Sequence, residues 1–131
     1  MTDEEITTFL AKPLEAVLAV SRPSGGPQLT VMWYLWDGEA FYISTTRDRA
    51  KYPNIRRDPE VSLIVNDQAA HSYIAAYGRA EFIEDDYERI AQCLNQLYAK
   101  YRPGSPPATA ETQRADNRVI LVLRPEKLLA R

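Results

Sequence analysis

Apolar residues along this chain gather in short runs, and Gly, Pro, Asp and Ser separate one run from the next. Runs that are rich in β-branched and aromatic residues and bounded by turn formers are typical of β-strands. The pattern predicts six strands, at Ala16–Arg22, Gln28–Trp36, Glu39–Thr46, Val61–Val65, Ser72–Ile83 and Val119–Leu123. Asp37-Gly38 predicts an antiparallel hairpin between the second and third, and Gly78 indicates a bulge or a close backbone approach. Together these signals predict a mainly β fold, a small antiparallel barrel with helices at its edge.

Two segments have helical rather than alternating periodicity. Thr2 and Glu5 have the spacing of a capping box, which predicts a short opening helix that ends before Pro13. Asp85 and Glu88 have capping spacing for a longer helix that Pro103-Gly104 stops. Its apolar stripe consists of Ile90, Cys93, Leu94, Leu97, Tyr98 and Tyr101. Cys93 is interpreted as a buried, reduced thiol in that stripe.

Composition limits the classes of protein that the chain can belong to. Its 131 residues, 45% hydrophobic, suit a single domain over residues 1–131, with the polar segment 103–117 as a loop. No apolar run approaches the roughly 20 residues that span a bilayer, and no secretory signal is visible, so we expect a cytoplasmic protein. With Cys93 and His71 as the only cysteine and histidine, an internal disulfide and a Cys/His zinc site are excluded, and no metal site is predicted. The net charge of −2 argues against a surface built as a whole for nucleic acid.

Positive charge is concentrated in the segment TTRDRAKYPNIRRDP, residues 45–59. Pro is tolerated in the first turn of a helix but not deeper, so Pro53 predicts a helix that begins only a few residues before it. Arg49 and Lys51 then lie at its amino end, where the helix dipole disfavours each cation by about 0.3–1 kcal/mol. Two interpretations are open: a solvated basic helix face, or a phosphate site built from a guanidinium, an ammonium and backbone N–H groups.

No motif in the chain supplies catalytic machinery of its own. There is no Walker loop, no G-x-G-x-x-G after a strand, no nucleophile elbow and no HExxH. No catalytic residue is therefore nominated. We expect an enzyme of this sequence to hold and orient a cofactor that supplies the chemistry.

The run GPQLTVMWYLWDGEAFYISTTRDRAKYPNIRRDPEVSLIV followed by SYIAAYGRAEFI resembles the split-barrel flavin and deazaflavin oxidoreductases related to pyridoxamine 5'-phosphate oxidase. The most specific part is R-A-K…N-[IL]-R-R-D-P, with the glycine of the fifth strand behind it. The chain is most similar to the branch that uses the deazaflavin coenzyme F420. The resemblance implies a six-stranded antiparallel split β-barrel of the FMN-binding type. It also implies a homodimer with its cofactors in grooves between the protomers.

The resemblance implies particular site residues as well. Arg49 and Lys51 would hold the cofactor phosphate, beside Ser44, Thr45 and the helix start at Tyr52–Ile55, while the second strand would run along the ring. The cofactor-binding residues that it implies are Gln28, Thr30, Val31, Met32, Ser44, Thr45, Arg49, Ala50, Lys51, Asn54 and Ile55. The charge pattern and the resemblance select the same two cations, which favours the phosphate site over the solvated face.

The implied activity is hydride transfer between reduced F420 and a flat, conjugated small-molecule acceptor, with FMN as the alternative cofactor. No residue is nominated as acid or base; Tyr73 and solvent are both candidate proton donors. A cofactor carrier without turnover stays open as an alternative. A nucleic-acid module on the Arg47–Arg57 cluster also stays open, although only Tyr52 supplies an interleaved aromatic residue.

The chain departs from its relatives at several positions. The second strand has no basic residues and the chain ends at RPEKLLAR without an arginine/histidine segment, so vitamin B6 oxidation is not expected. His71 stands where relatives often place a tryptophan, and we interpret it as a polar surface residue. Trp33, Tyr34 and Trp36 are candidates for a substrate pocket, with core or dimer packing as the alternative for at least two of them.

Overall fold

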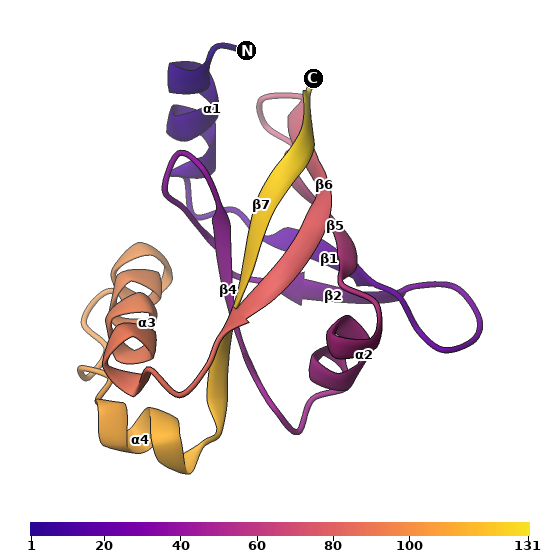
Figure 1. Cartoon of the computed structure of the whole chain (residues 1–131). Coiled ribbons are helices and arrows are strands. Elements are labelled where there is room, and N and C mark those ends of the chain that lie inside the picture. Colours follow the sequence, from indigo (N-terminus) through magenta and orange to yellow (C-terminus); the bar gives the residue numbers. More distant parts are fainter.

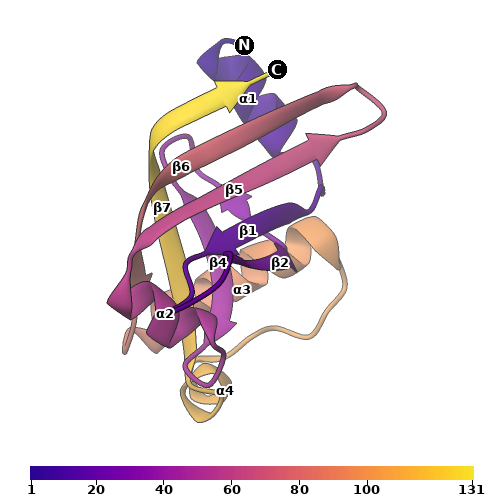
Figure 2. The same cartoon turned by 90° about the vertical axis from the view of Figure 1, so that its right-hand side faces the viewer.

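The computed structural model describes residues 1–131 and shows a mainly β protein (Figure 1). Its elements are α1 (Asp3–Leu10), β1 (Ala16–Val20), β2 (Gln28–Met32), β3 (Leu35–Trp36), β4 (Phe41–Thr46), α2 (Lys51–Arg57), β5 (Glu60–Asp67), β6 (Ser72–Ile83), α3 (Tyr87–Tyr101), α4 (Ala110–Ala115) and β7 (Arg118–Ala130). All strands join in one antiparallel sheet of order β2-β1-β5-β6-β7-β4-β3. The sheet curls into a half-closed barrel (Figure 2), so the predicted split barrel is confirmed. No helix is long and apolar enough to cross a membrane.

The predicted second strand is two strands, which is why the sheet has seven strands and not six. β2 and β3 lie at opposite edges of the sheet. Between them, Tyr34 is buried in the barrel core and Trp33 stacks on Tyr101 of α3, with 4.9 Å between ring centroids. The Tyr34 N–H donates to the Tyr101 hydroxyl at 3.3 Å, and the Lys100 ammonium donates to the Tyr34 carbonyl at 3.1 Å. Side chains of α3 thus bind the backbone groups of Tyr34 that a neighbouring strand would otherwise bind. The continuous apolar run in the sequence does not show that the strand is interrupted there.

β7 is buried on both faces over its first half. Leu121 and Leu123 pack in the barrel core, whereas Ile120 and Val122 pack under α3. A strand that is buried on both faces has a continuous apolar run rather than an alternating one, as this segment has. β7 extends to Ala130, beyond the predicted end at Leu123, because its second half continues to pair with β6.

The glycine inside β6 is a bulge and a point of close backbone approach, as predicted. The register between β6 and β7 shifts at Tyr77/Gly78. A Cβ atom at Gly78 would lie 2.9 Å from the Arg124 carbonyl oxygen and 3.0 Å from Leu123 Cδ1. Only glycine therefore fits between the two backbones here.

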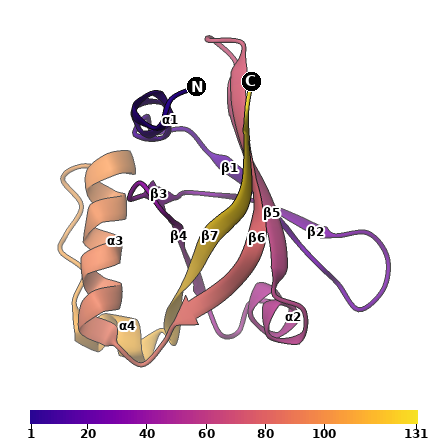
Figure 3. The same ribbon diagram turned by 45° about the horizontal axis from the view of Figure 1, so that its top comes forward.

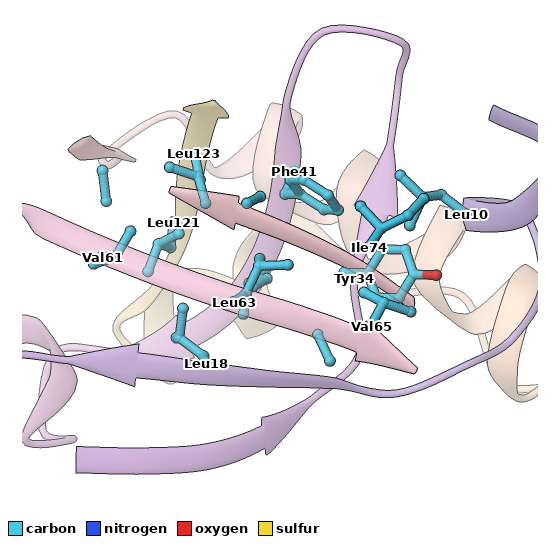
Figure 4. Close-up of a cluster of buried hydrophobic side chains, with 14 of the residues drawn as sticks. Leu10, Leu18, Tyr34, Phe41, Val61, Leu63, Val65, Ile74, Leu121 and Leu123 are labelled. Carbon is cyan, nitrogen blue, oxygen red and sulfur yellow. The ribbon is translucent and has the colours of Figure 1, made fainter. Parts of the chain in front are cut away.

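The main hydrophobic core fills the interior of the barrel (Figure 4). Strands on all sides of the barrel supply its side chains, among them Leu18, Val61, Leu63, Val65, Ile74, Leu121 and Leu123. Leu10 of α1 closes one end of this core, and Ile55 of α2 packs against it as well. Each such side chain stabilises the fold by about 1.5–3 kcal/mol when it is fully buried.

Helix caps decide where α1 and α3 begin. The predicted capping box of α1 is confirmed: the Glu5 N–H donates to Thr2 Oγ1 at 3.1 Å, and the Thr2 N–H donates to Glu5 Oε1 at 3.0 Å. The predicted cap of α3 is off by one residue. Asp86 accepts a hydrogen bond from the Arg89 N–H at 3.2 Å, while Asp85 stands outside the helix with a φ of 62°.

The segment predicted as a loop, residues 103–117, contains the short helix α4. Its cap is Thr109, whose hydroxyl accepts from the Thr112 N–H at 3.3 Å. Asn95 of α3 holds the preceding stretch, because its side chain bonds both the N–H and the carbonyl of Ala108. On the buried face of α3, burial raises the pKa of the Cys93 thiol to about 12, which agrees with the predicted unreactive thiol.

The helices lie on two sides of the strands. Figures 1 and 3 show α3 and α4 on one side and α2 on the other, close to the edge strand β2. The loop between β1 and β2 projects away from the body on the side of α2. α2 contacts both β1 and β4, so it bridges the two parts of the curled sheet near its open edge.

Candidate functional site

Hydrogen bonds and ion pairs divide the cations of the predicted basic segment into two groups. Arg47 pairs with Glu84 at the end of β6 at 3.3 Å, and Arg56 pairs with the same carboxylate. Arg57 donates to the Ser21 carbonyl at 3.0 Å. These three guanidinium groups therefore stabilise the fold around α2 and are not free to bind a ligand.

The aromatic residue of the segment is engaged too. The Tyr52 hydroxyl donates to Glu84 at 2.5 Å, and its ring packs on Phe82 with 4.9 Å between centroids. A nucleic-acid module on this segment would need that ring as a stacking platform. The contacts of Tyr52 argue against that use.

Lys51 and Arg49 form the second group, since neither makes an ion pair. Lys51 is only 6% exposed, and its one hydrogen bond, to Thr30 Oγ1, is 3.4 Å long. Burial, assisted by the positive charge of Arg49, lowers the pKa of Lys51. A buried ammonium without a counter-charge destabilises a fold. A bound anion at this place would supply that charge.

Both cations line an open groove of about 600 Å³. The residues around it come from β2, β4, the β4–α2 connection, α2, the α4–β7 connection and the start of β7. They are Thr30, Met32, Ser44, Thr45, Thr46, Asp48, Arg49, Lys51, Asp116 and Arg118. Met32 is the one hydrophobic side chain among them. Hydroxyl and cationic groups dominate the wall, and such a wall suits an anionic ligand.

The start of α2 brings the two cations to this groove. α2 begins at Lys51 with Pro53 as its third residue, as the proline predicted. Ala50 precedes it and offers no side-chain cap. Because α2 has only 7 residues, its dipole is weaker than that of a long helix, so the side chains of Arg49 and Lys51 supply most of the positive charge.

The alternation of β2 divides its predicted site residues. Thr30 and Met32 line the groove, and Val31 points to the other face of the sheet, where it is 57% exposed. The Val31 side chain therefore does not line the groove, and any contact of Val31 with a cofactor there would come from its backbone. Gln28 is outside the lining, with its Oε1 buried and without a hydrogen-bond partner.

Of the remaining predicted residues, Ser44 and Thr45 line the groove and three others do not. Ala50 is exposed beside it. The Asn54 side chain accepts from Arg57 at 3.0 Å, within α2. Ile55 is 2% exposed and belongs to the barrel core, so its side chain cannot contact a ligand. The helix start that was expected to help hold the phosphate thus contributes through Lys51 alone among its side chains.

Three lining residues were missed: Asp48, Asp116 and Arg118. Arg118 reaches the groove because it pairs with Thr46 across β4 and β7. An arginine that opens a strand after a polar segment is a visible signal. The partner strand of that arginine is not visible in the pattern, so its arrival at the groove could not be predicted.

The aromatic candidates for a substrate pocket do not line the groove. Tyr34 is in the core, Trp33 stacks on α3 and Trp36 packs against the core, so the packing alternative describes them. His71 is exposed in the turn between β5 and β6, with a φ of 51°, as expected for a polar surface residue. Tyr73, the candidate proton donor, pairs with Asn66 on β5 and lies outside the groove.

A family model described as pyridoxamine 5'-phosphate oxidase matches residues 2–131. The chain belongs to the pyridoxamine 5'-phosphate oxidase family. Among solved structures, an F420 reductase shares 32% identity and a TM-score of 0.77, over 93% of this chain and 94% of the other. This relative agrees with the predicted F420-dependent branch of the family.

Other solved structures share the fold without being F420 reductases by name. A conserved hypothetical protein from Mycobacterium tuberculosis shares 27% identity and a TM-score of 0.84, over 99% of this chain and 84% of the other. The heme storage protein of Vibrio cholerae shares 17% identity and a TM-score of 0.70, over 96% and 92% of the two chains. The second likeness shows the fold alone. Family membership therefore supports an oxidoreductase or a cofactor-binding protein and leaves the particular cofactor to be argued from the site.

Proposed function

We propose that this protein is an oxidoreductase that binds reduced F420 and transfers a hydride to a flat, conjugated small-molecule acceptor. The observation that carries the proposal is Lys51, a buried ammonium without a carboxylate partner in a groove that also contains Arg49. The F420 reductase among the similar structures favours F420 over FMN. FMN is the alternative, because its phosphate would meet the same two cations.

The groove fits the phosphate end of such a cofactor. Arg49 and Lys51 would bind the phosphate, as a planar fork and a point charge, and the hydroxyls of Ser44 and Thr45 would donate to its oxygens. Thr30 would run beside the ring. The bound deazaflavin would supply the hydride, so the protein has to hold it, orient it and exclude water.

The side chains around the groove offer no general acid. The lining contains no histidine, cysteine or tyrosine. A hydrogen bond from Thr46 holds the pKa of Asp48 below its ordinary value, so this carboxylate is ionised near neutral pH. The proton that accompanies a hydride would therefore come from solvent and not from Tyr73, which lies outside the groove.

A second copy of the chain completes the proposed site. One chain supplies a single apolar lining residue, Met32, which is too little wall for a planar aromatic ring. The outer face of the sheet carries an apolar row in register across five strands: Val31, Val17, Ile64, Ala75 and Leu129. This face begins on β2, the strand whose other side lines the groove, so a partner packed on it would lie next to the cofactor. We therefore propose a homodimer with the cofactors between its protomers.

Titration of the purified protein with F420 and with FMN, followed by fluorescence quenching, tests the proposal. Replacing Lys51 by methionine should lower the affinity for each cofactor by about tenfold or more, since a charge-assisted hydrogen bond is lost. Arg89→Met is the matched control, because Arg89 is exposed on α3, away from the groove and from the apolar sheet face, and that variant should bind as wild type does. Equal affinities of wild type and Lys51→Met for both cofactors would refute the site.

Turnover separates the enzyme from a carrier. The reduced F420 complex would be incubated with quinones, enones and tetrapyrroles while its absorbance is followed. Oxidation that depends on one acceptor class supports the reductase. The lack of a histidine, cysteine or tyrosine in the groove also suits a protein that only stores its cofactor, and no oxidation by any acceptor would favour that function.

A further inference from the structure

The groove contains a third cation to which the proposed phosphate site assigns no role. Arg118 is the first residue of β7 and lines the groove. Its Nη1 donates to the Ser44 hydroxyl at 3.2 Å, its Nη2 is 4.0 Å from the Asp116 carboxylate, and its Nε is buried without a partner. A guanidinium has five N–H donors, so this one retains unused donors inside the groove.

The backbone holds Arg118 in place before any ligand arrives. Asn117 has a φ of 54°, a left-handed conformation that asparagine tolerates better than most residues. Its carbonyl accepts from the Arg47 N–H at 3.1 Å. Together with the pairing of Arg118 and Thr46, these contacts fix the direction in which the chain enters β7.

Lys51 and Arg118 belong to different walls of the groove. The Lys51 ammonium reaches Thr30 on β2, one edge of the sheet. Arg118 reaches Ser44 on β4, the strand next to the other edge. The groove, at about 600 Å³, is much larger than one phosphate group, so the two cations can bind separate groups of the same ligand.

We infer that Arg118 is a second anion-binding position, which takes an anionic group of the cofactor side chain other than the phosphate at Arg49 and Lys51. The inference rests on the proposed function. The ligand class is a phosphate-bearing cofactor with at least one further carboxylate or phosphate. FMN ends in a single phosphate, whereas F420 carries carboxylates beyond its phosphodiester. Arg118 is therefore a specificity residue that favours F420 over FMN, and Asp116 beside it weakens that preference by repelling the same group.

The test measures the affinities of F420 and FMN for the full chain in wild type, Lys51→Met, Arg118→Met and Asp116→Asn. Arg118→Met should lower the affinity for F420 by about tenfold or more and the affinity for FMN by less than about twofold. The reason is that the charge-assisted hydrogen bonds of Arg118 are lost only for the ligand with two anionic groups. Asp116→Asn should raise the affinity for F420 and leave the affinity for FMN unchanged. An equal loss for both cofactors in Arg118→Met, or a loss for neither, would overturn the inference.

Failure of the inference and failure of the proposed function have different signatures. The proposed function fails when Lys51→Met binds both cofactors as wild type does, whatever Arg118 does. Thermal unfolding of each variant without ligand reports whether the fold is intact. If Arg118→Met does not fold, Arg118→Lys and Asp116→Asn take its place. Lysine keeps the positive charge but lacks the planar fork of arginine. Arg118→Lys should therefore bind F420 more weakly than wild type does, and should bind FMN as wild type does. Unchanged F420 affinity in both of these variants would overturn the inference as well.

Discussion

At the scale of single residues, Lys51 has opposite effects on stability and on binding. Its ammonium is buried beside another cation, with a long hydrogen bond to Thr30 and no carboxylate. Burying a charge in this way costs free energy of folding, and only a bound anion would compensate for it. A residue selected for the stability of the ligand-free chain alone would not be a lysine.

Replacing Lys51 by methionine should therefore stabilise the ligand-free protein. We expect the free energy of unfolding to rise by about 1–3 kcal/mol, because an apolar side chain of similar length removes the cost of a buried charge. Urea unfolding with and without F420 measures the effect, and the added stability that F420 gives should be smaller in the variant than in wild type. Arg89→Met should change neither quantity. A ligand-free Lys51→Met protein that is less stable than wild type would contradict the interpretation.

The titration of Lys51 gives a second prediction, on pH. Because burial and Arg49 lower the pKa of Lys51, the free protein loses this proton at a lower pH than an exposed lysine does. A bound phosphate stabilises the ammonium, so binding takes up a proton above that pKa, and affinity falls as the pH rises through it. FMN dissociation constants between about pH 7 and about pH 9.5 measure this, since its phosphate is already dianionic there.

The control for this pH dependence is Lys51→Arg. Arginine stays charged over the whole range, so its FMN affinity should be nearly constant with pH. A parallel fall in wild type and in Lys51→Arg would assign the titration to another group.

At the scale of elements, local patterns predicted the structure where local contacts determine it. The capping box at Thr2, the hairpin at Asp37-Gly38 and the start of α2 near Pro53 all depend on neighbours in sequence, and all three are confirmed. The break at Trp33–Tyr34 was not predictable, because contacts from α3, distant in sequence, cause it.

The same distinction applies to the groove. Arg49 and Lys51 could be recognised because a proline nearby placed them at a helix start. Arg118 could not be, because its place depends on which strand pairs with β7. Conversely, Ile55 was expected in the site and lies in the core, since sequence spacing alone does not show which side of a short helix faces the barrel.

Gly78 offers a test at this scale. Gly78→Ala should lower the free energy of unfolding by about 1–3 kcal/mol, because the added methyl group would press on the Arg124 carbonyl and on Leu123. Gly26→Ala is the matched control: nothing lies within 4 Å of a Cβ atom at Gly26, so this change should be neutral or slightly stabilising. Urea unfolding measures both. Equal stabilities of the two variants would show that the β6–β7 contact is not tight.

At the scale of the whole molecule, the outer face of the sheet is the feature that stands out. Leu29 and Val31 are 65% and 57% exposed on β2, and Ile64 and Tyr77 are 38% and 44% exposed on β5 and β6. Contiguous apolar area of this kind marks an interaction surface rather than ordinary scatter. The proposed homodimer covers it.

Val31→Asp tests that assembly. A charge in the apolar row should dissociate the dimer, because the carboxylate would be desolvated in the interface. The same substitution should also lower the affinity for F420, because the partner no longer completes the groove. Light scattering during gel filtration measures the mass, with Gln96→Asp on the exposed side of α3 as the control. A wild-type protein that elutes as a monomer at micromolar concentration would refute the dimer.

Glu84 limits how strongly the basic surface around α2 can bind polyanions. One carboxylate pairs with Arg47 and Arg56. Of the three cations of the run that make no ion pair, Arg49 and Lys51 line the groove and Arg57 is held by Ser21. Glu84→Gln would release the Arg56 guanidinium from its ion pair and leave Arg47 with Asp85 alone, and we expect that variant to be retained on heparin at salt concentrations that elute wild type. The preference of this surface for a small ligand over an extended polymer thus depends on an acidic residue that the small ligand never touches.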